Sequence, residues 1–219
     1  PFRGQPSGEW TPADALAFGW ERVKADPVAT ILPVFVAGLI SNSVSMVGNF
    51  VQQVAPNSTG VQILGAVLTL ISMVIGVYMN GGVLYFILKV ARGEKGELGD
   101  VFKGGPYFFS LLGSGLLIGL AVSFAMLLFI VPGVYLGLAW SLTTFLIVDK
   151  ELGAIDAMRE SWSLTEGHRA NIFVFSLLSF ALFMAVGILT CCMGLIVLGP
   201  ILHLAFAYVY LKISGQQTA

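Results

Sequence analysis

The chain carries little charge. Asp, Glu, Lys and Arg make up 11% of its 219 residues, whereas apolar residues make up 57%. A soluble domain carries about 25% charged residues, because its surface must face water. The shortage therefore excludes an ordinary soluble globule and a disordered chain. Eleven Lys and Arg against twelve Asp and Glu give a net charge of −1, so the basic face that nucleic-acid binding needs is missing as well. An integral membrane protein remains.

Residue types that perform chemistry are also scarce. The chain has two Cys and two His. Cys191 and Cys192 are adjacent at a turn, and adjacent cysteines do not readily form an unstrained disulfide. His168 lies among charged residues, and no phosphate-binding loop, nucleophile motif or metal-ligand spacing is present. We expect no catalytic residue, no cofactor and no metal site, and hence a protein that is not an enzyme.

The charges are grouped, and three stretches between the groups contain none. These stretches are 27–88, 104–148 and 170–211. A membrane-spanning helix takes about 20 residues, so each stretch suits two helices joined by a turn. The sequence therefore predicts an all-α integral membrane fold with six transmembrane helices arranged as three hairpins. The expected spans are 27–51, 61–88, 107–130, 133–149, 170–190 and 195–212.

The arrangement of charges also predicts topology. An even number of spans places every Lys and Arg on one side, and positive loops face the cytoplasm. We expect both termini to be cytoplasmic. Residues 11–213 are expected to form a single membrane domain, after a polar segment 1–10 and before a tail 214–219. No pattern of a secretory signal peptide is visible near Pro1.

Each predicted hairpin is preceded by a segment with helical periodicity. Thr11 and Asp14 form a capping-box pattern at the start of the first segment. Trp20 in the first segment and Trp162 in the third lie among apolar residues, and the middle segment 98–102 is shorter. We expect three amphipathic interfacial helices, with the two tryptophans as anchors. Two interpretations stay open, a threefold internal repeat or a shared appearance of interfacial helices.

Four polar residues inside the predicted spans are candidate functional positions. His203 precedes Lys212 by nine residues, or about 13 Å along a helix, which is near the middle of the membrane. Asn42 and Asn49 lie in the first span, and Asn80 precedes two glycines in the second. Such residues line a polar cavity or form hydrogen bonds between helices. The lack of an acidic or second histidine partner for His203 favours the structural interpretation.

Glycines four residues apart are typical of close helix packing in lipid. Gly115 and Gly119 have this spacing in the third span, and Gly133 and Gly137 have it in the fourth. The sequence favours contacts within the chain over a seam between subunits, because a bundle needs such contacts first.

One stretch resembles known proteins. It reads FIVPGVYLGLAWSLTTFLIVDKELGAIDAMRESWSLTEGHRANIF. With Gly199-Pro200 further on, it resembles a broad group of prokaryotic six-helix membrane proteins, which includes YciC-like inner-membrane proteins and the membrane domain of some glycerophosphodiester phosphodiesterases. The resemblance covers roughly 12–213. It implies a six-span fold and the bacterial inner membrane, and it supplies no functional residue. No catalytic phosphodiesterase domain is present, so that activity is not implied.

Two functions follow as hypotheses. The first is a membrane-embedded subunit or scaffold of a homo- or hetero-oligomer, because the chain has almost no mass outside the membrane. The alternative is a transporter, channel or lipid-handling protein that uses a polar cavity. The expected partners are membrane lipids and other membrane subunits or further copies of the chain, and no nucleic acid.

Overall fold

The computed structural model describes residues 10–54, 58–190 and 193–218, and this part of the chain is helical without strands. The elements are α1 (Pro12–Ala25), α2 (Pro27–Val54), α3 (Thr59–Ala91), the 3₁₀-helices η1 (Leu98–Phe102) and η2 (Gly105–Tyr107), α4 (Phe108–Leu128), α5 (Ile130–Ala139), α6 (Thr143–Lys150), α7 (Ala154–Thr165), α8 (Arg169–Leu189) and α9 (Leu195–Ile213). The predicted all-α class is confirmed. Cys191 and Cys192 lie outside the described residues.

Six segments are long and apolar enough to cross a membrane, as predicted. They are Pro27–Val54, Thr59–Ala91, Leu98–Leu128, Ile130–Lys150, Arg169–Leu189 and Leu195–Ile213. Two differ from expectation. The third begins earlier than predicted, because η1 and η2 lead directly into α4. The fourth is two short helices, α5 and α6, and not one continuous helix.

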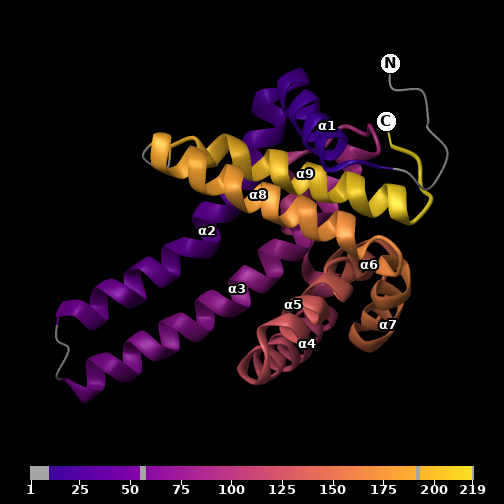
Figure 1. Cartoon of the computed structure of the whole chain (residues 1–219). Helices are drawn as coiled ribbons and strands as arrows, with labels where there is room; N and C mark the ends of the chain where they lie inside the picture. Colours follow the sequence, from indigo (N-terminus) through magenta and orange to yellow (C-terminus); the bar gives the residue numbers. More distant parts are fainter. Residues whose placement is uncertain (1–9, 55–57, 191–192, 219) are drawn as a thin grey trace.

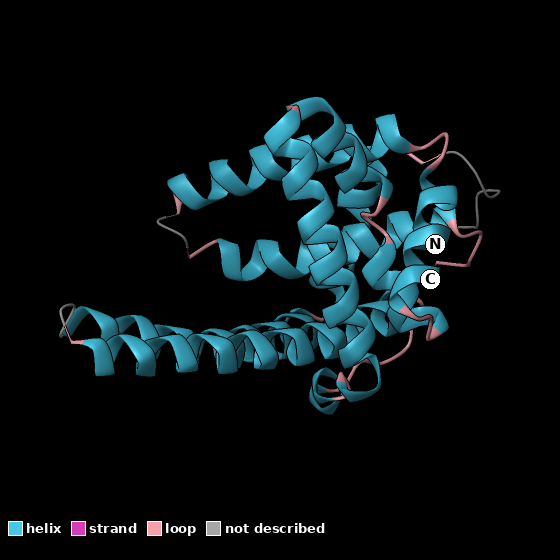
Figure 2. Cartoon of the chain, turned by 90° about the horizontal axis from the view of Figure 1, so that it is seen from below, coloured by secondary structure: helices cyan, strands magenta, loops and turns pink. Residues whose placement is uncertain are grey.

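Long helices lie side by side as pairs in Figure 1, where α2 accompanies α3 and α8 accompanies α9. The two pairs diverge toward the turns that join their helices (Figure 2). The helices α2 and α3 have 28 and 33 residues, against 21 in α8 and 19 in α9. At 1.5 Å per residue, α2 and α3 are about 42 and 50 Å long, more than the roughly 30 Å of a hydrocarbon core.

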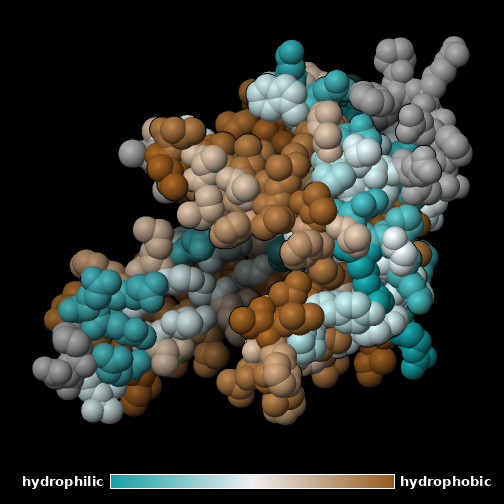
Figure 3. Space-filling model, viewed as in Figure 1, coloured by the Kyte–Doolittle hydropathy of each residue, from teal (hydrophilic) through white to brown (hydrophobic). Residues whose placement is uncertain are grey.

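The buried core lies near the charged ends of the helices. Phe86 of α3, Leu146 of α6 and Tyr210 of α9 are fully buried there. By contrast, only 11 to 17% of the most apolar windows of α2, α3 and α8 is buried. Hydrophilic residues gather over the far part of the α2–α3 pair, whereas the surface over α8 is strongly hydrophobic (Figure 3). The hydrophobic surface suits lipid, since lipid tails solvate apolar side chains as well as a neighbouring helix does.

The helix α1 begins where the sequence predicts. Thr11 Oγ1 accepts a hydrogen bond from the backbone N–H of Asp14 at 3.3 Å, and the Asp14 carboxylate accepts one from the N–H of Thr11 at 3.1 Å. The helix packs on α9 through Phe18, whose ring lies 4.9 Å from that of Tyr208. Trp20 faces outward, with 54% of its surface exposed.

The other two leading segments differ from each other. The middle one is the five-residue 3₁₀-helix η1, whose Asp100 is buried. The third is the helix α7, whose Trp162 is partly exposed. The Arg169 guanidinium lies between two rings, 4.7 Å from the centre of Trp162 and 4.6 Å from that of Tyr135. This cation–π contact joins α5, α7 and the start of α8.

Candidate binding cavity between α3, α6 and α9

A break in the fourth candidate span forms one wall of the cavity. The helix α5 ends at Ala139 and α6 begins at Thr143, so the carbonyl of Ala139 lacks its usual helical partner. Ser161 Oγ donates to this oxygen at 2.9 Å, and Thr165 Oγ1 donates to it at 3.2 Å. An unpaired carbonyl is costly in a membrane. The two buried hydroxyls of α7 therefore stabilise the break.

Close packing against η1 positions the α3 wall. A Cβ atom at Gly82 would lie 1.8 Å from the carbonyl oxygen of Val101, and one at Gly104 would lie 1.8 Å from that of Tyr78. Only glycine allows this approach of the two backbones. Asn80 comes two residues before Gly82, so its side chain projects from a different side of α3. The Asn-Gly-Gly run therefore has two roles, since Gly82 packs against η1 and Asn80 lines the cavity.

The α9 wall carries the histidine. His203 Nδ1 lies 2.8 Å from the carbonyl oxygen of Gly199, one turn earlier in the same helix. A carbonyl oxygen only accepts hydrogen bonds, so Nδ1 carries a proton and donates. In the neutral ring, Nε2 then has a free lone pair. This helix also contains Pro200, which has no N–H to donate.

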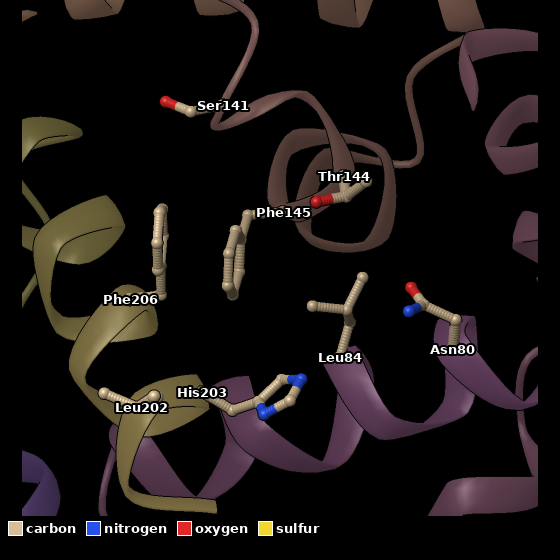
Figure 4. Close-up of a pocket in the computed structure, with 8 residues that line it drawn as sticks. All are labelled: Asn80, Leu84, Ser141, Thr144, Phe145, Leu202, His203 and Phe206. Carbon is tan, nitrogen blue, oxygen red and sulfur yellow. The ribbon is translucent and has the colours of Figure 1, made fainter. Parts of the chain in front are cut away.

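These three walls border an open cavity of about 300 Å³. Figure 4 shows the side chains of Asn80, Thr144 and His203 around it. The complete lining is Asn80, Leu84, Ser141, Thr144, Phe145, Leu202, His203 and Phe206. Half of these residues are polar and half are apolar, and none is Asp, Glu, Lys or Arg. The volume lies at the lower end of the range for small-molecule sites.

Two of the polar side chains make no hydrogen bond within the described part of the chain, namely Asn80 and Thr144. Ser141 Oγ donates to the carbonyl oxygen of Leu138 at 2.8 Å and retains its lone pairs. The cavity therefore offers unpaired donors from an amide and a hydroxyl beside unpaired acceptors, including His203 Nε2.

A second cavity of about 340 Å³ shares Asn80 and Thr144 with the first. It lies between α3, α4 and α6, and its other lining residues are Met73, Gly76, Val77 and Leu111. The two cavities therefore share one amide and one hydroxyl, and the second is otherwise lined by apolar residues of α3 and α4.

The depth of the site follows from the helices that carry it. Asn80 comes nine residues before Lys89, and His203 comes nine residues before Lys212. Each therefore lies about 13 Å along its helix from a cationic side chain. Each of these residues lies inside a predicted span, and the structure brings them to one cavity.

Charged side chains at the nearby helix ends are paired with each other. Asp100 is 1% exposed, and its carboxylate lies 3.0 Å from Lys89 Nζ and 2.6 Å from Lys103 Nζ. These ion pairs hold η1 against the C-terminal end of α3.

A second carboxylate joins three other elements. Asp149 accepts hydrogen bonds from Tyr210 Oη at 2.6 Å and Gln216 Nε2 at 2.7 Å, and it forms an ion pair with Arg92. The contacts link the ends of α3, α6 and α9 with the residues after α9. A polar cavity of about 220 Å³ lies beside this cluster, lined by Lys89 and Glu151 among others.

The remaining predicted polar residues lie elsewhere. Asn42 is exposed on α2, and its amide donates to the carbonyl oxygen of Gly38 at 2.8 Å. Asn49 is exposed on the same helix. Neither lines the cavity that contains Asn80 and His203.

The predicted packing glycines have different surroundings. A Cβ atom at Gly133 would lie 2.3 Å from Met126 Cγ, at the turn between α4 and α5. Cβ atoms at Gly115, Gly119 and Gly137 would meet nothing within 4 Å. These three glycines therefore bring no described part of this chain into close contact.

Ser141, Thr144 and Phe145 are lining residues that the sequence analysis missed. The sequence carries a signal for them, because Ser and Thr follow Trp140 within the predicted fourth span, and such residues compete for backbone hydrogen bonds. Within the described residues, no group of three or more His, Cys, Asp or Glu is placed to hold a metal ion.

Sequence comparisons point to bacterial membrane proteins. No family model matches the chain, and no solved structure matches it. It is 27% identical to Uncharacterized protein Rv2560 of Mycobacterium tuberculosis, over 99% of this chain and 72% of that protein. It is 30% identical to UPF0259 membrane protein PC1_1998 of Pectobacterium carotovorum, over 55% of this chain and 49% of that protein.

A further relative is UPF0259 membrane protein SG1383 of Sodalis glossinidius, which is 37% identical over 44% of this chain and 39% of its own length. Two of these three names state a membrane protein, and the chain has six candidate membrane-spanning helices. Together these findings support a bacterial family of multi-pass integral membrane proteins.

Proposed function

We propose that the chain is a non-enzymatic subunit of a larger membrane assembly, built from further copies of itself or from other membrane chains. The observation that carries the proposal is a face of small residues on α4. Gly115, Gly119 and Ser123 follow each other at four-residue intervals, and all three are exposed. Small residues at this spacing let helix backbones approach in lipid. No described helix of this chain occupies the space beside the two glycines.

Exposed amides on α2 support the same proposal. Asn42 lies sixteen residues after Asp26, or about 24 Å along the helix, which is within a hydrocarbon core of about 30 Å. Asn49 follows seven residues later on the same side. An amide that faces lipid is unfavourable, and a neighbouring subunit that hydrogen-bonds with these side chains would remove the cost.

The proposed topology has three hairpins, with both termini in the cytoplasm and the protein in the bacterial inner membrane. The positive-inside rule and the resemblance to YciC-like proteins and phosphodiesterase membrane domains support it. In this arrangement α1, η1 and α7 lie at the cytoplasmic interface. Trp20 and Trp162 are the interfacial anchors.

Native mass spectrometry on the protein, extracted from its own membranes in a mild detergent, tests the assembly. An integer multiple of the chain mass is expected for a homo-oligomer, and defined foreign chains are expected for a hetero-oligomer. A species that is always one chain alone would overturn the proposal.

A variant pair tests the α4 face directly. Gly119→Leu places a bulky side chain on the face and should abolish the assembly. Ala121→Leu makes a comparable enlargement on the other side of α4 and should leave the assembly mass unchanged. Equal assembly of both variants would show that this face of α4 is not the contact surface between subunits.

The cavity favours a second candidate function, a transporter, channel or lipid-handling protein. It combines unpaired polar groups with apolar walls at membrane depth, where uncommitted polar residues are typical of substrate paths. Movement of a fluorescent lipid or a solute across reconstituted vesicles tests this candidate. Vesicles without protein and vesicles with the Asn80→Leu variant serve as controls, and movement that equals both controls would reject it.

A further inference from the structure

No Asp, Glu, Lys or Arg lines the cavity between α3, α6 and α9. Asn80, Thr144 and His203 lie about 13 Å or less along their helices from the nearest charged side chains. The cations Lys89 and Arg92 at the charged end are already paired with Asp100 and Asp149. A charged group inside the cavity would have no counter-ion and would be costly to bury. The chemistry of the lining therefore selects an uncharged ligand.

The unpaired groups require a ligand that both donates and accepts hydrogen bonds. His203 Nε2 accepts, because Nδ1 is bonded to the carbonyl oxygen of Gly199. The Asn80 amide donates through nitrogen, and the Thr144 hydroxyl does either. A ligand head with hydroxyl groups matches this set, since one hydroxyl can donate to His203 Nε2 and another can accept from Asn80 or Thr144. An ester or ketone would only accept and would leave Nε2 unpaired.

The apolar walls indicate a hydrocarbon tail beside the hydroxyl. The rings of Phe145 and Phe206 are stacked with centres 6.3 Å apart and planes inclined by 7°, and they form one side of the cavity (Figure 4). Asn80 and Thr144 also line the second cavity, whose other walls include Met73 and Leu111. An alkyl chain anchored at the polar groups would follow this apolar surface along α3.

We propose that this cavity binds an uncharged lipid whose head carries a hydroxyl group, with the head at Asn80, Thr144 and His203 and the tail along α3 and α4. The inference rests on the second candidate function above, whose ligand class it names. It is independent of the assembly proposal, which the oligomer mass tests. Binding is also distinguishable from transport, because a lipid can bind without being moved.

Photochemical cross-linking tests the site in the full-length protein. A monoacylglycerol with a photoreactive group in its acyl chain is added to the protein in vesicles of phosphatidylethanolamine and phosphatidylglycerol. After irradiation, peptide mapping should find the label in peptides that contain residues 141–145, 202–206 and 73–84. Label that is absent from all these peptides would overturn the proposal.

Competition with unlabelled ligands identifies the head group. Monoolein, methyl oleate, oleate and free glycerol are compared at equal concentrations. Monoolein should suppress the labelling, and methyl oleate should require a concentration about tenfold higher, because it lacks the donor for His203. Methyl oleate or oleate as effective as monoolein would contradict the hydroxyl assignment. Displacement by glycerol alone at the monoolein concentration would contradict a lipid and identify a small polyol instead.

Variants locate the binding groups within the cavity. His203→Leu and Asn80→Leu should each weaken monoolein competition about tenfold. His203→Gln keeps an acceptor and should restore part of the lost affinity. Asn171→Leu is the matched control, because it makes the same change at an exposed position of α8 and should not affect competition. Wild-type affinity in both cavity variants would overturn the proposal. The competition series with wild-type protein decides the matter if either variant fails to fold.

Discussion

Ser161 Oγ of α7 lies 2.9 Å from the carbonyl oxygen of Ala139, the last residue of α5. This hydrogen bond joins an element outside the candidate spans to the break inside one of them. The break places Ser141 and Thr144 at the cavity, so the shape of the cavity depends on a helix that does not line it.

Ser161→Ala should destabilise the fold. The variant removes one donor to Ala139 and leaves only Thr165 bonded to that carbonyl, so the free energy of unfolding should fall by about 1–2 kcal/mol. The measurement is denaturant unfolding in detergent. Ser163→Ala is the control, because Ser163 Oγ bonds only to Glu160 in its own helix, and it should change stability by less than about 0.5 kcal/mol. Equal effects of the two substitutions would contradict the role of Ser161.

Asp149→Asn should be more damaging than loss of a surface ion pair. The Asp149 side chain is 5% exposed and holds Arg92, Tyr210 and Gln216 together. Loss of the charge weakens three hydrogen bonds and should cost about 2–3 kcal/mol. Glu160→Gln breaks only the exposed pair with Lys150 and should cost about 0–1 kcal/mol. The same unfolding assay compares the two variants. A smaller loss of stability in Asp149→Asn than in Glu160→Gln would contradict a stabilising role of the Asp149 cluster.

Gly82→Ala and Gly76→Ala should have opposite effects, although both lie in α3. A Cβ at Gly82 would overlap the carbonyl of Val101, whereas one at Gly76 meets nothing within 4 Å. Gly82→Ala should therefore lower stability by about 2 kcal/mol or more, through overpacking. Gly76→Ala should be neutral or stabilising by up to about 1 kcal/mol, because alanine favours a helix. A stable Gly82→Ala protein would show that η1 does not pack closely against α3.

Single cysteines should report the proposed topology. In a Cys191→Ser/Cys192→Ser background, Ser58→Cys lies at a turn between two candidate spans and Lys95→Cys lies in a charged loop. A membrane-impermeant maleimide applied to intact spheroplasts should label Ser58→Cys at once, and Lys95→Cys only after permeabilisation. The reverse labelling pattern would show that the protein has the opposite orientation in the membrane.

The spans were predictable because charge is excluded from the hydrocarbon region, so the gaps between charged residues mark the segments that cross it. The break at Trp140–Leu142 was not predictable in the same way. It contains no charged residue, and the carbonyl of Ala139 before it is satisfied by Ser161 and Thr165, more than twenty residues away.

The depth of the cavity residues along their helices was predictable from the sequence, but the directions in which their side chains face were not. Counting residues from Lys89 and Lys212 places Asn80 and His203 at equal distances from the charged ends. Whether two residues at one depth face each other depends on how each helix is rotated, which tertiary contacts decide. Here the contact of Gly82 with η1 and the packing of α1 on α9 through Phe18 and Tyr208 set those rotations.

The position of the core has a mechanical consequence. Because the tightly packed layer lies at the charged ends, the α2–α3 pair is an arm attached at its base. An arm about 42–50 Å long fits a hydrocarbon core of about 30 Å by tilting. A thinner bilayer increases the tilt and a thicker one reduces it, with little loss of buried contact. The cavity lies close to the base of this arm, because Asn80 and Leu84 of α3 line it, so we expect its width to change with the thickness of the surrounding membrane.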